Sequence, residues 1–262
     1  MKIGFIGAGN MGGAIIGGIV RENIKDEILV FDKNTELLFK LSKEFGVKKA
    51  IDNKEIAKKS DIIFLAVKPN VLSFVIDEIK DEIKKDTLLV SIVAGKGIKT
   101  IESAFGKAIK LIRVMPNTPA LVGEGMSALC KNENVEKEEL EKVLEIFEKL
   151  GRAEIVAESM MDAVTAVSGS SPAYVFMLIE AMADAAVLGG LPRNQAYTFA
   201  SQAVLGAAKM VLETKKHPGE LKDMVCSPSG TTIEAVKILE QSGFRSAIID
   251  AMGACIEKSK KM

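Results

Sequence analysis

Three glycines near the start of the chain have a spacing that could cradle phosphate groups. Gly7, Gly9 and Gly12 form a G-x-G-x-x-G sequence between an apolar run and a helical pattern. In such turns the first glycine allows a tight bend, the second lets the backbone approach a pyrophosphate, and the third lets the helix pack on the strand. Steric needs alone also produce glycine turns. The strand–turn–helix order, and Asp32 at the end of the next strand, favour a dinucleotide site.

A second group of chemically capable residues lies near the other end of the chain. Ser227, Ser229, Thr231 and Thr232 surround Gly230 just before the helical run 233–239. One or two of these hydroxyls could simply cap that helix. Four hydroxyls around a glycine indicate instead a pocket for a small anion. A substrate carboxylate would accept backbone N–H groups at the helix start, which leaves a hydroxyl for a neighbouring atom of the substrate.

The elements that position these residues alternate between strands and helices in the first half of the chain. Short β-branched or continuously apolar runs predict strands, and apolar residues three or four apart predict helices. The predicted strands cover residues 2–6, 27–31, 61–67, 87–93 and 109–115, and the predicted helices cover residues 11–21, 35–45, 53–59 and 71–83. We expect Asn53 to cap the third helix. The alternation indicates an α/β fold with a doubly wound parallel sheet of the Rossmann type.

Two further loops follow predicted strands at their carboxyl ends, where such sheets bind ligands. Residues 66–70 read AVKPN and residues 92–95 read IVAG. Pro69 would also serve as a helix-initiating proline with no ligand nearby. The loop after Arg113 is longer and richer in turn residues than a minimal connection requires.

The second half of the chain has a different character. Residues 163–208 contain only three charged side chains, Glu180, Asp184 and Arg193, among residues with helical periodicity. Helices that are apolar around most of their circumference must be buried around most of it. A domain of about 100 residues has too little interior for that. We therefore expect a helical domain that pairs with a second copy of the chain.

Composition excludes several classes of protein. The 35 basic and 35 acidic residues cancel, so the chain lacks the charge expected of a dedicated nucleic-acid or membrane-surface binder. Three widely spaced cysteines form no CxxC pair, which predicts reduced thiols and no metal site. The uncharged runs 3–20 and 163–179 contain glycines or a proline that disfavour a membrane span. We expect a cytoplasmic protein.

The order and spacing of several motifs resemble those of the pyrroline-5-carboxylate reductase family. The resemblance covers essentially the whole chain and rests on GFIGAGNM, FLAVKP, RVMPNTP, DAVTAVSGSSPAY, GLPR, LGAAKM, HPGELKD and SPSGTTIEA. It implies reduction of 1-pyrroline-5-carboxylate to L-proline by NAD(P)H, the last step of proline biosynthesis. It also implies a Rossmann domain over residues 1–158 and a helical domain over residues 159–262 that binds substrate and forms a homodimer, or a larger assembly of dimers.

The same resemblance implies which residues contact the ligands. The nucleotide contacts would be Ile6, Gly7, Ala8, Gly9, Asn10, Met11, Asp32, Lys33, Asn34, Asn53, Ala66, Val67, Lys68, Pro69, Ile92, Val93 and Ala94. The substrate contacts would be Glu158, Ser227, Gly230, Thr231 and Thr232. Two departures from the family pattern are Ser229, where Gly is common, and Met224, where Asn or Gln is common.

The chemistry of a cyclic imine assigns roles to a few of these residues. Thr232 is our choice for the catalytic donor to the ring nitrogen, and Glu158 could be either an orienting group or an ordinary carboxylate at the domain boundary. His217, the only histidine, is expected to be structural. Asp32 favours NADH, whereas Lys33 and Asn34 could bind the 2′-phosphate of NADPH, so we expect both cofactors to work with NADPH preferred.

Two other functions fit parts of the sequence. β-Hydroxyacid dehydrogenases share the glycine turn. However, they resemble one another in carrying a catalytic lysine on the first long helix of the second domain. Residues 170–190 contain no Lys or Arg. A dinucleotide sensor without catalysis would not need the hydroxyl cluster. An assay with pyrroline-5-carboxylate would distinguish all three.

Overall fold

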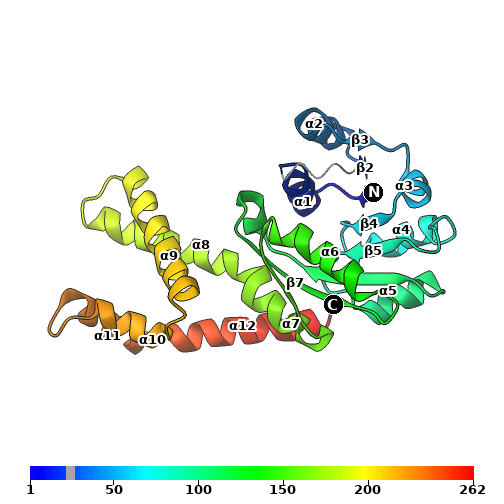
Figure 1. Cartoon of the computed structure of the whole chain (residues 1–262). Helices are drawn as coiled ribbons and strands as arrows, with labels where there is room; N and C mark the ends of the chain where they lie inside the picture. Colours follow the sequence, from blue (N-terminus) through cyan, green and yellow to red (C-terminus); the bar gives the residue numbers. More distant parts are fainter. Residues whose placement is uncertain (22–26) are drawn as a thin grey trace. The chain divides into compact units, whose positions relative to one another are not determined.

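The computed structural model describes residues 1–21 and 27–262 and divides into two compact units (Figure 1). The sheet unit comprises residues 1–170 and 255–262, and the helical unit comprises residues 171–254. Hydrogen bonds hold residues 255–262 against the rest of the sheet unit, one of them from Cys255 Sγ to Ser170 Oγ at 3.3 Å. Ser259 Oγ donates to Asp162 Oδ1 at 2.6 Å, and Lys96 Nζ donates to the Met262 carbonyl at 3.3 Å. The domain boundary expected after residue 158 stays a prediction.

The sheet unit contains one eight-stranded sheet in the order β3-β2-β1-β4-β5-β6-β7-β8. All neighbouring strands are parallel except β6 and β7, which are antiparallel. The strands are β1 (Lys2–Ile6), β2 (Glu27–Phe31), β3 (Lys48–Lys49), β4 (Ile62–Leu65), β5 (Leu88–Ser91), β6 (Lys110–Met115), β7 (Gly125–Lys131) and β8 (Gly151–Ile155). Order 3-2-1-4-5-6 across the first six strands is the Rossmann arrangement, so the predicted fold class is confirmed.

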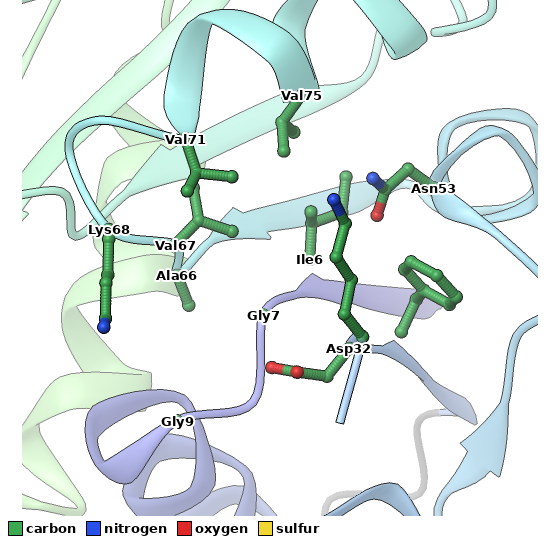
Figure 2. A pocket seen from close by; sticks show the side chains of 12 residues that line it. Ile6, Gly7, Gly9, Asp32, Asn53, Ala66, Val67, Lys68, Val71 and Val75 are labelled. Carbon is green, nitrogen blue, oxygen red and sulfur yellow. The ribbon is translucent and has the colours of Figure 1, made fainter. Parts of the chain in front are cut away.

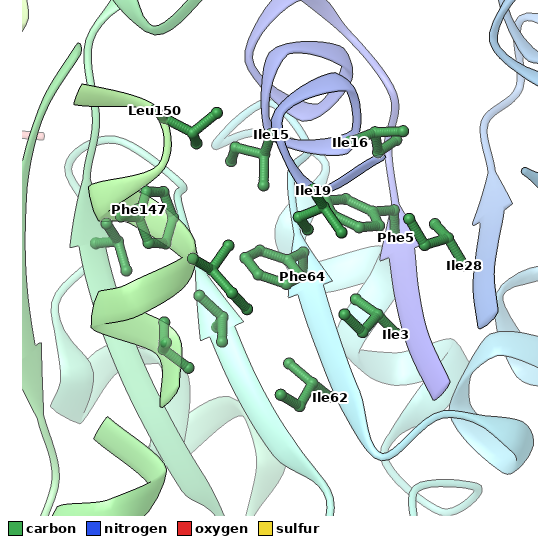
Figure 3. Close-up of a cluster of buried hydrophobic side chains, with 14 of the residues drawn as sticks. Ile3, Phe5, Ile15, Ile16, Ile19, Ile28, Ile62, Phe64, Phe147 and Leu150 are labelled. Carbon is green, nitrogen blue, oxygen red and sulfur yellow. The ribbon is translucent and has the colours of Figure 1, made fainter. Parts of the chain in front are cut away.

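The central strands are buried on both faces, as their continuous apolar sequences predict. All four residues of β4 and of β5 are buried. On one face, Phe5 and Phe64 stack with ring centroids 4.5 Å apart, and Phe147 packs beside Phe64 (Figure 3). A second apolar cluster on the other face includes Ile63, Leu65 and the buried side of α4. The two clusters pack both faces of the sheet whose carboxyl edge carries the glycine-rich turn.

Helices cover the sheet, and those that follow β1 to β5 begin after the loops of that edge. The helices of the sheet unit, apart from the end of α12, are α1 (Asn10–Arg21), α2 (Thr35–Phe45), α3 (Asn53–Lys59), α4 (Leu72–Ile79), α5 (Ile98–Phe105), α6 (Lys137–Glu148) and α7 (Met161–Val164), with short turns at Thr118–Val122, Glu158–Met160 and Thr165–Ser170. The four helices predicted before residue 84 are confirmed, although α4 is shorter than expected. The prediction that Asn53 caps α3 is wrong. Asp52 is the N-cap, and its carboxylate accepts from the Glu55 amide. Asn53 is thereby free for another role.

Residues 116–158 form structure that the sequence pattern did not predict. The long loop after Arg113 contains a 3₁₀ turn whose Ala120 is fully buried. Asn117 ties this loop to its neighbours: its Oδ1 accepts from the Met126 amide at 2.8 Å, and its Nδ2 donates to the Ser168 carbonyl at 3.0 Å. The antiparallel β7 therefore follows a structured connection.

The helical unit consists of helices, as expected. They are α8 (Ser171–Leu188), α9 (Arg193–Thr214), α10 (Pro218–Val225), α11 (Thr231–Gln241) and α12 (Phe244–Lys260), whose last turns belong to the sheet unit. Many of its large apolar side chains are exposed in the single chain, Phe176 at 63% and Leu188 at 91%. Such a surface needs a partner.

One helical stretch of the described residues, Glu158–Leu188, is long and apolar enough by length and composition to cross a membrane. The same property is found in helices of soluble proteins that pack against other helices, so a single stretch is weak evidence for a span.

Candidate nucleotide and substrate sites

A pocket of about 260 Å³ lies at the carboxyl edge of the sheet, above the glycine-rich turn (Figure 2). It brings together nine of the residues predicted to contact nucleotide, and three apolar residues that were not predicted. The lining residues are Ile6, Gly7, Gly9, Phe31, Asp32, Lys33, Asn53, Ala66, Val67, Lys68, Val71 and Val75. Figure 2 shows Val67, Val71 and Val75 along one side and Asp32 facing Gly7. The pocket combines an apolar slot with a polar rim.

The three glycines of the turn differ in what a side chain would meet at each position. Gly7 has φ of +93°, and a Cβ there would lie 2.5 Å from the Ala66 carbonyl oxygen. A Cβ at Gly12 would lie 2.9 Å from the Gly7 carbonyl oxygen, so that glycine permits the helix to pack on the turn. A Cβ at Gly9 would meet no protein atom within 4 Å. The backbone at Gly9 is thus open on the ligand side, and α1 begins there with free N–H groups.

Asp32 holds the turn through both carboxylate oxygens. Oδ2 accepts from the Ala8 amide at 2.7 Å, and Oδ1 accepts from the Asn34 amide at 2.8 Å. The Asn34 side chain caps α2 by accepting from the Leu37 amide. Because two N–H donors already compensate the Asp32 charge, its repulsion of a nearby phosphate is reduced.

Asn53 is the one buried amide in the wall of the pocket. The residue is 6% exposed, and its Nδ2 donates to Glu78 Oε2 at 2.5 Å. Its Oδ1 is buried without a hydrogen-bond partner. A buried acceptor left unpaired costs about 1–3 kcal/mol. This orphaned oxygen fits a pocket that receives a hydrogen-bond donor from a ligand.

The other predicted nucleotide residues do not line the pocket. Asn10 and Met11 open α1, and Asn34 precedes α2. Pro69 lines a separate hollow beside Lys96. Ile92, Val93 and Ala94 follow β5 in the loop that Met262 covers at Gly95. The unpredicted Phe31, Val71 and Val75 could have been found from the i, i+4 spacing on α4 and the last position of β2.

Glu158 lies outside the nucleotide pocket, in a hollow with Cys130 and Asn132. Its Oε1 accepts from the Ile98 amide at 2.7 Å, at the start of α5, and from the mostly buried Arg113 guanidinium at 3.1 Å. Burial, reinforced by the Glu158 charge, raises the pKa of the Cys130 thiol to about 11. Cys130 is therefore protonated at neutral pH and is not a nucleophile.

The hydroxyl cluster forms the start of α11 in the helical unit. Gly230 is the N-cap, and no side chain caps the helix, so the interpretation of these hydroxyls as simple caps is not supported. A Cβ at Gly230 would collide with Ser227 Oγ. Ser229 has φ of +56°, the left-handed region that favours glycine. This is the position at which the family commonly has glycine.

His217 has a structural role, as expected. It is the N-cap of α10, and its Nδ1 accepts from the Gly219 amide at 3.1 Å. Within residues 1–21 and 27–262, no group of three His, Cys, Asp or Glu side chains is arranged to hold a metal ion.

Comparisons with known proteins cover both units. The family model described as pyrroline-5-carboxylate reductase dimerisation matches residues 158–262, and the one described as NADP oxidoreductase coenzyme F420-dependent matches residues 2–95. The chain is 54% identical to the pyrroline-5-carboxylate reductase of Escherichia coli (strain K12), over 100% of this chain and 98% of that one. It is 47% identical to the enzyme of that name from Methanosarcina acetivorans, over 100% and 97% of the two chains.

Solved structures agree in fold over the full length. The pyrroline-5-carboxylate reductase from Coxiella burnetii has a TM-score of 0.92 and 35% identity, covering 99% of this chain and 97% of that one. The pyrroline carboxylate reductase from Plasmodium falciparum, with NADP bound, has a TM-score of 0.90 and 35% identity, covering 100% and 97%. The dimerisation match supports a homo-oligomer. By sequence and fold together, this chain belongs to the pyrroline-5-carboxylate reductase family.

Proposed function

We propose that this protein reduces 1-pyrroline-5-carboxylate to L-proline with NADPH as hydride donor. The observation that carries the proposal is the 54% identity, over the full length, to a protein named for that activity. Both the glycine-turn pocket and the hydroxyl cluster lie within the matched residues. The reaction is NAD(P)H-dependent reduction of a C=N bond in proline biosynthesis.

The nucleotide pocket fits a dinucleotide on three observations. The open backbone at Gly9 can approach a pyrophosphate, the apolar slot formed by Val67, Val71 and Val75 can accept a base, and the unpaired Asn53 Oδ1 can accept a hydrogen bond. Lys33 on the rim supplies a positive charge for a 2′-phosphate, while Asp32 is compensated by two amides. We propose NADPH as the preferred cofactor, with NADH also used.

For the substrate, we propose that Ser227, Gly230, Thr231 and Thr232 bind the carboxylate and the imine. The N–H groups at the start of α11 are suited to the carboxylate. Thr232 Oγ1 donates a hydrogen bond to the ring nitrogen, which makes the imine carbon a better acceptor of hydride, and the nitrogen takes the required proton from solvent. The nicotinamide, when bound, supplies the hydride, and the protein contributes orientation and charge stabilisation. Glu158, whose Oε1 is tied to Ile98 and Arg113, is proposed to orient the surrounding loops rather than to transfer a proton.

We propose a cytoplasmic homodimer, or a larger assembly built from dimers, with a small-molecule substrate and no nucleic-acid or membrane partner. The exposed apolar surface of α8 and α9 supports pairing of two copies. Pairing of two copies would also cover the apolar stretch Glu158–Leu188 without a membrane.

The decisive experiment follows nicotinamide absorbance with pyrroline-5-carboxylate and either cofactor. We expect turnover with both, and higher kcat/KM with NADPH. A protein that binds NADPH but shows no turnover with this substrate would favour a sensor. Turnover of a β-hydroxyacid in its place would favour the dehydrogenase.

A further inference from the structure

The amide of Asn53 is held by one partner on the side away from the ligand. Asn53 is the first residue of α3, and its Nδ2 donates to Oε2 of Glu78, near the end of α4. Glu78 is exposed and does not line the nucleotide pocket, whereas Asn53 is 94% buried and does. This side-chain hydrogen bond thus links α3 to α4 beside the pocket, in addition to the apolar packing between the two helices.

This bond decides which way the amide faces. An ionised carboxylate can only accept hydrogen bonds, so it must face the NH₂ group of an amide and not its oxygen. A rotation of the amide by 180° would place two oxygens against each other. Glu78 therefore fixes Oδ1 on the opposite side, where it is buried and unpaired. Figure 2 shows the Asn53 amide beside Ile6, among the side chains that line the pocket.

We infer that Glu78 is a positioning residue for the dinucleotide: it orients Asn53 so that Oδ1 accepts a hydrogen bond from the adenosine end of the ligand. The inference rests on the proposed function. Ile6, Val67 and Val75 line the same pocket with apolar side chains, which offer no acceptor to a ligand. The ribose hydroxyls and the adenine amino group are both donors and could satisfy Oδ1. A ligand group without a donor would leave the oxygen unpaired.

Substitution of Glu78 tests the inference through NADPH affinity, measured by fluorescence titration on the intact protein. We expect Glu78→Ala to weaken binding about 5- to 20-fold, the size of one hydrogen bond. Glu78→Gln should restore near-normal binding, because its carbonyl oxygen can still accept from Nδ2. Glu78→Lys should bind most weakly, because an ammonium donor reverses the preferred orientation of the amide. Asp77→Ala and Asp77→Lys are matched controls, since Asp77 is exposed on the same helix and pairs with Lys80.

A double-mutant cycle shows whether Glu78 acts through Asn53. We expect Asn53→Ala to weaken NADPH binding and the double variant Asn53→Ala with Glu78→Ala to bind no more weakly than Asn53→Ala alone. KM for NADPH should rise in the Glu78 variants, whereas kcat and KM for the imine should stay within about twofold of wild type. Additive effects in the cycle would refute the inference.

A hypoxanthine analogue of NADPH identifies the donor. If the adenine amino group is the donor, the analogue should bind equally well to wild type and Glu78→Ala. If a ribose hydroxyl is the donor, Glu78→Ala should weaken NADPH and the analogue alike. Wild-type protein that fails to bind NADPH would contradict the proposed function. Wild-type binding that Glu78→Lys leaves unchanged would contradict this inference alone.

Discussion

The two units solve the problem of burying apolar surface in opposite ways. The sheet unit encloses two clusters of aromatic and aliphatic side chains on the two faces of its sheet. Within residues 171–254, all of which are described, the buried apolar residues are Ala183, Ala196, Ala200 and Leu221. The larger side chains there face outward. We therefore expect the sheet unit to be stable on its own interior and the helical unit to be stabilised by pairing with another copy of the chain.

The largest effect should come from a charge on the exposed apolar surface of α9. Ala203 is exposed in the single chain, and we expect it to lie in an interface of more than about 2,000 Å². Ala203→Asp should yield insoluble or unfolded protein, because an unpaired charge would be buried on pairing. Solubility and sedimentation velocity measure this. Lys43→Asp, on the exposed surface of α2, is the matched control. A wild-type protein that sediments as a monomer at micromolar concentration would contradict pairing through this surface.

The next largest effect should come from Thr232, whose hydroxyl we propose as the donor to the imine nitrogen. Thr232→Val keeps the size of the side chain and removes the donor, so kcat should fall about 10- to 1,000-fold. NADPH affinity, which we place in the sheet unit, should be nearly unchanged. Thr214→Val, at the end of α9, is a control that also loses a hydroxyl. Normal turnover in Thr232→Val would remove Thr232 from the mechanism.

A change in the sheet unit should alter cofactor choice and leave assembly intact. Lys33→Ala removes one of the two lysines that line the pocket, so the NADPH/NADH ratio of kcat/KM should fall about tenfold, equivalent to about 1.4 kcal/mol. Steady-state kinetics with both cofactors measure the ratio, and sedimentation checks the assembly. Lys40→Ala on α2, away from the pocket rim, serves as the control. An unchanged ratio would mean that another residue sets the preference.

The smallest effects should come from glycine substitutions at the two positive-φ residues of the helical unit, which separate backbone strain from a role in substrate binding. Ser229 and Lys215 both have φ of +56°. Glycine relieves this strain but increases the entropy of the unfolded chain, so each change to Gly should raise the free energy of unfolding by about 1 kcal/mol or less. Thermal unfolding measures both. Ser229→Gly should also change KM for the imine, whereas Lys215→Gly should not. Equal kinetics in the two variants would contradict a role for the Ser229 backbone in substrate binding.

The sequence allowed much of the sheet unit to be predicted, because its signals are local. Continuous apolar runs and the glycine turn identify β1, β4 and β5 and the pocket above them. The capping role of Asp52 and the bond from Asn53 to Glu78 were not predicted, since they depend on how α3 and α4 pack in space. The antiparallel β7 was missed for a similar reason: its direction depends on a loop held by Asn117.

In the helical unit, composition predicted helices and pairing but could not predict which side chains face outward. Residues 163–208 carry only three charged side chains, so periodicity marks no buried face on α8 and most of α9. The positive φ of Ser229 is likewise a property of the folded loop, although the serine in place of the family's usual glycine drew attention to that position.

The return of residues 255–262 to the sheet unit has a consequence for synthesis on the ribosome. Domains usually fold in the order in which they emerge. Here the contacts of Ser259 with Asp162, and of Met262 with Lys96, form only after the whole helical unit has left the exit tunnel. The loop at Gly95, which these last residues cover, stays open to water until then. Nascent chains stalled after residue 254 should accordingly be cleaved by protease near Gly95 faster than released chains.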